Sequence, residues 1–302
     1  MSRVPIPEPV KRVLRQSAGF GCCVCGHPFV EYHHIAPYSG DPHHDLSKMM
    51  TLCPNHHHEA TVGALSVEAQ YGAKTRPYNV TRGYADGLLK VDAHELAIEV
   101  GTNYFVGAGL KLLVDDEPLL AITSDCDGHL ALSATIYDRD DNLLLLLDKN
   151  EWVTGDSLPW DVQYGYNRIS VRQRRGDISL EVDARRLPVA IKGRLHRKAQ
   201  TFQVNASTLR IDGVRENIQY QRLGLVAMQI VVDTAARVIR FGPYAPFQHG
   251  MLVSNPDAAE RLRLSLEAYR RMVRELPIPG NSECFCGSGR PFKSCCEMGG
   301  AA

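Results

Sequence analysis

Apolar and polar residues alternate along most of the chain between residues 93 and 246, with a turn about every ten positions. Such alternation is typical of strands that bury one face, and Gly, Asp and Asn supply the turns between them. The pattern predicts an all-β region, either a sandwich or a stacked, solenoid-like sheet. The expected strands are residues 95–100, 111–114, 119–123, 130–137, 143–148, 168–173, 178–182, 202–205, 228–233 and 238–241.

Outside this region, helical spacing and capping residues predict three helices. The first covers residues 9–16, after a proline-rich start. The second covers residues 67–74, with Ser66 as its N-cap. The third covers residues 257–275 and is opened by Asn255-Pro256, with the asparagine as cap and the proline at the first helical position.

These elements predict a multi-domain α+β protein. We expect a small N-terminal domain over residues 1–92 and an all-β domain over residues 93–250. A helix and a stiff, proline-rich linker follow over residues 251–280, and a short tail closes the chain over residues 281–302.

Composition is that of a folded protein with a sizeable core, because 44% of the 302 residues are hydrophobic and 23% are charged. The longest apolar run, residues 143–147, is far too short to cross a bilayer. The first residues contain no hydrophobic segment with a cleavage site. We therefore expect a cytoplasmic protein with no membrane partner.

The formal net charge is zero, which argues against a uniformly basic nucleic-acid binder. Charge is unevenly distributed, however: residues 91–160 carry 3 basic and 14 acidic side chains, whereas residues 161–275 carry 20 and 11. Within the basic segment Arg168, Arg172 and Arg174 share one parity, so a strand would present them on one face as a row for phosphates. The alternative is an ordinary solvated strand face.

Residues 22–60 hold four of the nine cysteines and eight of the twelve histidines. Cys22 and Cys25 have the two-residue spacing that lets one tight turn offer two thiolates to an ion, and Cys53 and His56 repeat that spacing. These four residues form a complete Cys3His set for structural Zn²⁺. Cys23 lacks the spacing and is left over. The alternative, a disulfide, is less expected in a reducing compartment.

Three histidines remain after the zinc ligands are assigned. His33 and His34 end a β-like run at residues 29–32, and His57 directly follows His56 where a helix begins. The zinc knuckle would join a strand pair to a helix, and these three histidines would not be needed as its ligands. Such an arrangement is a scaffold for a second ion.

Residues 20–80 resemble the HNH endonuclease family, which has a ββα-metal fold. His33 and His34 match the first signature pair, and residues 52–57, LCPNHH, match the closing signature. The middle asparagine of the family is Lys48 here, and the last metal histidine is Thr61.

This resemblance implies a metal-dependent endonuclease. His34 would be the general base, and His33 and His57 would hold a catalytic Mg²⁺ or Mn²⁺, with Ni²⁺ accepted in vitro. Lys48 would belong to the same catalytic set.

By the same resemblance the substrate is DNA, with RNA not excluded, the setting is restriction or anti-phage defence, and the active form can be a homodimer. The alternative is a catalytically inactive, zinc-stabilised module that binds nucleic acid or protein.

The tail contains a second cysteine cluster. Cys284, Cys286, Cys295 and Cys296 offer four thiolates in a segment with little core of its own, so metal binding would supply its folding energy. The segment resembles the SEC-C zinc motif. The resemblance implies a second structural Zn²⁺ and a protein partner that docks on the tail.

Overall fold

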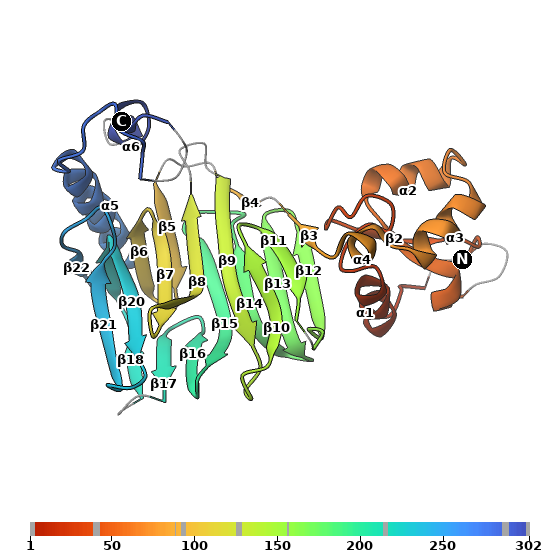
Figure 1. Cartoon of the computed structure of the whole chain (residues 1–302), viewed down its shortest axis with the longest axis horizontal. Helices are drawn as coiled ribbons and strands as arrows, with labels where there is room; N and C mark the ends of the chain where they lie inside the picture. The colour runs from red at the N-terminus through yellow and green to blue at the C-terminus, as the bar shows by residue number, and fades with distance from the viewer. Residues whose placement is uncertain are drawn as a thin grey trace.

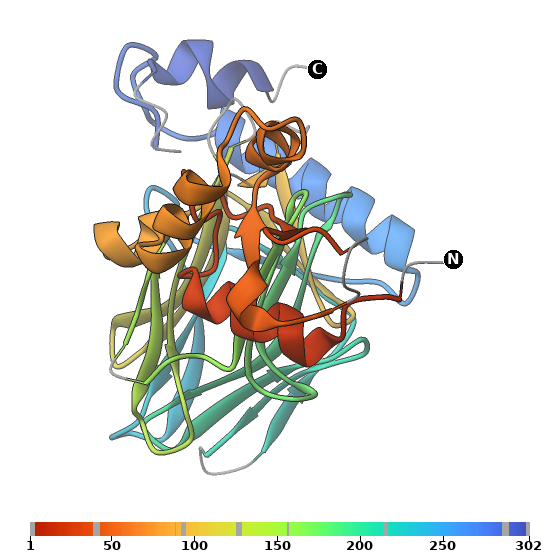
Figure 2. The ribbon, with the colours of Figure 1, turned by 90° about the vertical axis from the view of Figure 1, so that its right-hand side faces the viewer.

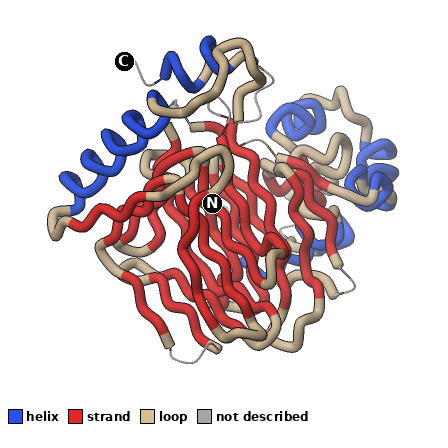
Figure 3. Tube along the Cα trace, turned by 60° about the vertical axis from the view of Figure 1, so that its left-hand side comes forward, coloured by secondary structure: helices blue, strands red, loops and turns tan. Residues whose placement is uncertain are grey.

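The computed structural model describes residues 4–38, 43–87, 89–91, 95–124, 129–155, 157–213, 217–285 and 290–299. The fold is α+β and consists mostly of strands, with helices grouped beside two large sheets (Figures 1 and 3). Within these ranges, every helix is too short or too polar to cross a membrane.

The N-terminal elements combine a strand pair with helices. Strands β1 and β2 are antiparallel, with His33 opposite Met50. The helices expected at residues 9–16 and 67–74 are confirmed, and the Ser66 hydroxyl accepts a bond from the Ala69 N–H at 3.2 Å. The elements are α1 (Glu8–Ser17), β1 (Glu31–His34), η1 (Leu46–Lys48), β2 (Met49–Leu52), α2 (Pro54–Thr61), α3 (Val67–Thr75) and α4 (Tyr78–Arg82).

The first large sheet has nine strands. Strand β4 (Leu89–Lys90) pairs with β9, outside the main path. In spatial order the main path is β21 (Val238–Pro243), β20 (Met228–Asp233), β7 (Gly109–Val114), β8 (Glu117–Ser124), β9 (His129–Tyr137), β10 (Leu143–Asp148), β11 (Glu151–Thr154) and β3 (Ala85–Asp86).

The second large sheet has eleven strands. Its main path is β12 (Asp161–Gly165), β13 (Arg168–Arg174), β14 (Asp177–Asp183), β15 (Val189–Arg197), β5 (Leu96–Val100), β6 (Asn103–Gly107), β19 (Leu223–Val226) and β22 (Met251–Ser254). A branch from β15 continues through β16 (Gln200–Val204), β17 (Leu209–Asp212) and β18 (Ile218–Tyr220).

One hydrophobic core joins the two sheets, which makes this region a sandwich rather than a solenoid. Burial alternates along β9, as the sequence pattern predicts. Strand β6 is buried at every position, because helix α5 (Ala258–Arg274) covers the face that looks away from the sandwich core. The shared core includes Leu112, Ile122 and Leu132 from the first sheet and Ile98, Val182 and Ile191 from the second.

Helix α5 (Ala258–Arg274) packs along the sandwich and is followed by η2 (Phe292–Ser294) and α6 (Cys296–Gly299) (Figure 1). The expected cap is wrong. Asp257 is the N-cap, and its carboxylate accepts the Glu260 N–H at 2.8 Å. Asn255 instead accepts the Asp257 N–H, so the Asn255-Pro256 pair forms the turn before the helix.

A buried ion pair joins the N-terminal elements to the sandwich. The Arg15 guanidinium of α1 donates to both carboxylate oxygens of Asp161 on β12, at 2.9 and 2.6 Å. Arg15 also contacts the Tyr32 hydroxyl of β1, and the Arg12 guanidinium stacks on the Trp160 ring at 4.1 Å. Helix α1 therefore contacts both β1 and the sandwich and fixes one against the other; in Figure 2 it is the red helix, drawn in front of the sheets.

We predict that Asp161→Asn destabilises the fold by about 3–5 kcal/mol, because it leaves the Arg15 charge buried without a carboxylate partner. Asp161 is only 1% exposed. Urea unfolding measures the change. The control is Glu8→Gln, which removes an exposed carboxylate 3.8 Å from Arg15 and should cost no more than about 0.5 kcal/mol. Equal effects of the two substitutions would contradict a structural role for the buried pair.

Candidate functional site

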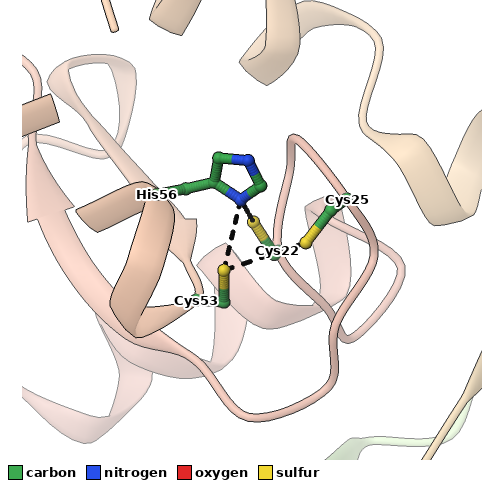
Figure 4. Close-up of side chains that lie close together, drawn as sticks. All are labelled: Cys22, Cys25, Cys53 and His56. Carbon is green, nitrogen blue, oxygen red and sulfur yellow. Dashed lines mark hydrogen bonds between the residues drawn. The ribbon is translucent and has the colours of Figure 1, made fainter. Parts of the chain in front are cut away.

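Four predicted ligands meet in the N-terminal elements. Cys22 and Cys25 come from the turn after α1, and Cys53 and His56 come from the start of α2 (Figure 4). The Cys53 Sγ lies 3.2 Å from His56 Nδ1, and the Cys22 Sγ lies 3.6 Å from it. The Cys25 and Cys53 sulfurs are 3.8 Å apart. All four ligand atoms lie within 4.8 Å of one another, so the cluster can hold a metal ion.

These separations match a tetrahedral ion with one nitrogen and three sulfur ligands. Zn–S bonds of about 2.3 Å at tetrahedral angles place sulfurs about 3.8 Å apart, and a nitrogen ligand about 3.6 Å from a sulfur. Burial raises the pKa of the Cys25 thiol to about 12 and also raises the pKa of Cys22. A cation among these groups would stabilise their thiolate forms and release protons on binding.

Local backbone geometry explains why the turn holds this shape. Gly26 has φ +77°, and its N–H donates to the Cys22 carbonyl at 2.8 Å. A Cβ at Gly26 would lie 2.1 Å from Asn79 Oδ1, so glycine is required there. The Asn79 amide from α4 donates to the carbonyls of Gly26 and Gly19. Cys23 stays outside the cluster, as predicted, with its sulfur 3.7 Å from the Thr51 hydroxyl.

A second group of side chains lies on the face of β1 that carries His33. Successive helical residues are rotated by about 100°, so His56 points to the cysteines while His57 points to β1. The His33 and His57 ring centres are 5.2 Å apart, edge to face. His57 therefore lies outside the cysteine cluster and beside His33.

Glu31 and Gln70 belong to this group, and sequence reasoning missed both. His57 Nδ1 donates to the Glu31 carboxylate at 2.5 Å, and His33 Nε2 donates to the Gln70 carbonyl oxygen at 3.1 Å. The Gln70 amide nitrogen donates to the Leu65 carbonyl, which fixes its orientation. Strand parity could have identified Glu31, since residues two apart share a face. Gln70 could not be identified from the sequence, because it lies on α3 and reaches His33 only through the tertiary fold.

His34 lies on the opposite face of β1 and is 7% exposed. Its Nε2 donates to the His43 carbonyl at 3.0 Å, so the other ring nitrogen, Nδ1, is the basic one in the neutral imidazole. Its ring lies 5.2 Å from both the Tyr38 and the His43 rings and 5.7 Å from the His44 ring. The structure thus separates His34 from the pair formed by His33 and His57.

Lys48 and Thr61, the two positions that depart from the HNH pattern, both make hydrogen bonds in the N-terminal elements. Lys48 ends η1, and its carbonyl accepts the Ile35 N–H at 2.8 Å, directly after the strand that carries His34. The Thr61 hydroxyl donates to the His57 carbonyl at 2.8 Å, one helical turn back. Thr61 is therefore turned onto its own helix.

The arginine row on β13 is largely neutralised. Arg168 lies 2.6 Å from Glu181, and Arg174 lies 3.2 Å from Asp177. Arg172 makes no ion pair with any residue of the described ranges. The strand register also shifts between Arg172 and Arg174. These contacts favour the alternative of an ordinary solvated strand face.

The tail brings together a second cysteine group. The sulfurs of Cys284, Cys295 and Cys296 lie within 4.8 Å of one another and can hold a metal ion, while Cys286 lies outside the described residues. The segment has more core than expected, because it packs against α5. The Phe285 ring lies 5.6 Å from Phe247 and 5.9 Å from Phe292.

Among the described residues, only these two cysteine groups bring three or more ligand atoms within 4.8 Å of one another. His33 and His57 therefore form a two-histidine arrangement with a carboxylate bonded to one ring. No known family model, curated protein or solved structure matches the chain.

We predict that Cys53→Ser lowers the metal content by one equivalent per chain relative to wild type, because three ligands hold the ion less well than four. Metal analysis of the purified, dialysed protein measures this. Cys23→Ser is the matched control and keeps the wild-type content, since Cys23 contacts Thr51 instead. Loss of the same equivalent in both variants would contradict the ligand assignment.

Proposed function

We propose that this chain is an HNH-type endonuclease that hydrolyses phosphodiester bonds in DNA with a divalent metal ion. One observation carries the proposal: His56 joins the cysteine cluster while the adjacent His57 turns to His33 and Glu31. In this proposal the two cysteine clusters hold structural Zn²⁺. The β1, β2 and α2 elements correspond to the ββα-metal core, and the tail corresponds to a SEC-C motif open to a protein partner.

The residues around His33 and His57 suit a divalent ion. Two imidazoles that share an ion through bonds of about 2.1 Å have ring centres about 5 Å apart, close to the 5.2 Å separation. Nitrogen ligands with a nearby carboxylate suit Mn²⁺ and Ni²⁺, and Mg²⁺ when water completes the set. A bound divalent ion supplies positive charge for the reacting phosphate and the departing oxygen.

The hydrogen bonds prepare each histidine for its role. Glu31 accepts the Nδ1 proton of His57, so Nε2 is the ligand nitrogen of that ring. Gln70 accepts the Nε2 proton of His33, which leaves Nδ1 as its ligand nitrogen. The His43 carbonyl fixes the His34 tautomer in the same way, with Nδ1 as the basic atom. Because His34 lies on the opposite face of β1, its ring must turn toward the ion at His33 and His57 to accept a proton from water there.

We predict that His34→Ala lowers the rate of plasmid nicking by about 100-fold or more, because a general base contributes at least that factor. The assay is run with Mg²⁺, Mn²⁺ and Ni²⁺ in turn. The control is His58→Ala, which removes an exposed histidine from the same helix as His57 and should leave the rate unchanged. Equal inactivity of wild type and His34→Ala in every metal would overturn the nuclease proposal.

We further predict that Glu31→Gln weakens Mn²⁺ binding by about 10- to 100-fold, because a carboxylate that orients a ligand histidine is typically worth that factor. Electron paramagnetic resonance of free Mn²⁺ measures the affinity without any cleavage. Glu68→Gln on α3 is the control and should bind like wild type. Unchanged affinity in Glu31→Gln would remove Glu31 from the metal centre.

A second candidate function is a non-catalytic module that binds nucleic acid or protein. It is favoured by Thr61, whose hydroxyl bonds to its own helix where the family has a further metal histidine. The nicking assay separates the two functions. Replacing the plasmid with RNA tests the remaining choice of substrate.

A further inference from the structure

A cavity of about 750 Å³ lies between the N-terminal elements and the end of the sandwich. Its size falls within the range of about 300–1,000 Å³ for small-molecule sites. One wall follows the cysteine turn, and the other is made by the tips of the β10–β11 and β12–β13 hairpins, one from each sheet. The lining includes His27, Phe29, Lys149, Glu151, Tyr164 and Tyr166.

The walls are held by specific contacts. The Cys22 N–H donates to the His27 carbonyl at 2.9 Å, so the metal turn fixes the first wall. On the second, Asn150 has φ +72° and its side-chain oxygen accepts the Leu132 N–H at 3.0 Å. Its carbonyl accepts the Gly87 N–H at 3.1 Å. The cavity is therefore preformed.

Aromatic side chains are exposed in this cavity. Tyr166 is 77% exposed at the tip of its hairpin and makes no hydrogen bond or ring contact within the described chain. Phe29 is 39% exposed on the opposite wall. The Tyr164 ring packs on Gly87, where a Cβ would lie 2.7 Å from it. Exposed aromatic rings are suited to stacking against a flat ligand.

The charges of the lining are balanced, which disfavours a phosphate as the occupant. Lys149 is opposed by Glu151, and Asp86 is paired with Arg82 at 3.1 Å. A phosphate site needs an excess of cations or N–H donors. Carboxylates instead accept the amino hydrogens on a nucleobase edge. The lining thus suits an uncharged, flat group that carries N–H donors.

The cavity is also close to the proposed metal centre. Phe29 lies four residues before His33, a distance of at most about 13 Å along the chain. We propose that this cavity binds one unstacked nucleobase of the strand whose backbone is cut at His33 and His57. The inference rests on the proposed function for its choice of ligand, and it assigns the sandwich the task of holding the substrate.

The test compares binding of two fluorescent probes, an oligodeoxyadenylate and an abasic phosphodiester of the same length, without added divalent metal. Wild type should prefer the base-bearing probe by about 10-fold or more, the value of one stacked base. Tyr166→Ala should lose this preference, and Tyr166→Phe should keep it because the ring remains. Tyr71→Ala removes another exposed tyrosine, 39% exposed on α3, and should behave like wild type.

Equal affinity of wild type for both probes would overturn the inference, as would an undiminished preference in Tyr166→Ala. Because this assay contains no catalytic step, its outcome is independent of the nicking assay. A base preference without nicking would leave the cavity assigned and overturn the nuclease. Nicking without a base preference would support the nuclease and overturn the assignment of the cavity.

Discussion

The N-terminal elements depend on the convergence of Cys22 and Cys25 with Cys53 and His56 at the start of α2. This helix has eight residues, none of them buried, so it has no hydrophobic face to hold it in place. Contacts at its first turn must therefore set both its position and its rotation. The rotation matters because it directs His56 and His57 to different neighbours. Without the cluster, the separation on which the proposed chemistry depends would be lost.

The sandwich contributes to the same geometry from the other side. Arg15 is bonded to Asp161 in one sheet and contacts Tyr32, which lies between Glu31 and His33 on β1. A guanidinium that is 6% exposed is expensive to bury, and only the bidentate carboxylate and the phenol offset that cost. Strand β1 is thus paired with β2, which leads into Cys53 of the cysteine cluster, and it is also contacted by the buried ion pair. This double attachment explains how a small strand pair can present histidines at a constant distance from the hairpin tips.

Sequence reasoning succeeded where a local rule decides the outcome. The two-residue spacings predicted the four-ligand cluster, and Ser66 predicted the start of α3. The alternation of apolar and polar residues predicted the strands that bury one face. It failed where distant segments decide. Strand β6 has no alternation because α5 covers its second face, and the ion pairs of Arg168 with Glu181 and Arg174 with Asp177 follow from a strand register that contains a shift. Gln70 reaches His33 only through tertiary packing, which no local rule predicts. Glu31 was also missed, although strand parity could have identified it.

The pairing order of the sandwich has a consequence for how the chain acquires its structure. Strands β5, β6 and β7 each pair in parallel with a strand much later in the sequence, namely β15, β19 and β20. Such distant contacts give a high contact order, so closure of both sheets is slow relative to the local N-terminal elements. During synthesis the edges of these three strands stay unpaired until the later strands have been translated. An unpaired edge recruits other chains, so nascent or truncated forms are the ones most exposed to aggregation.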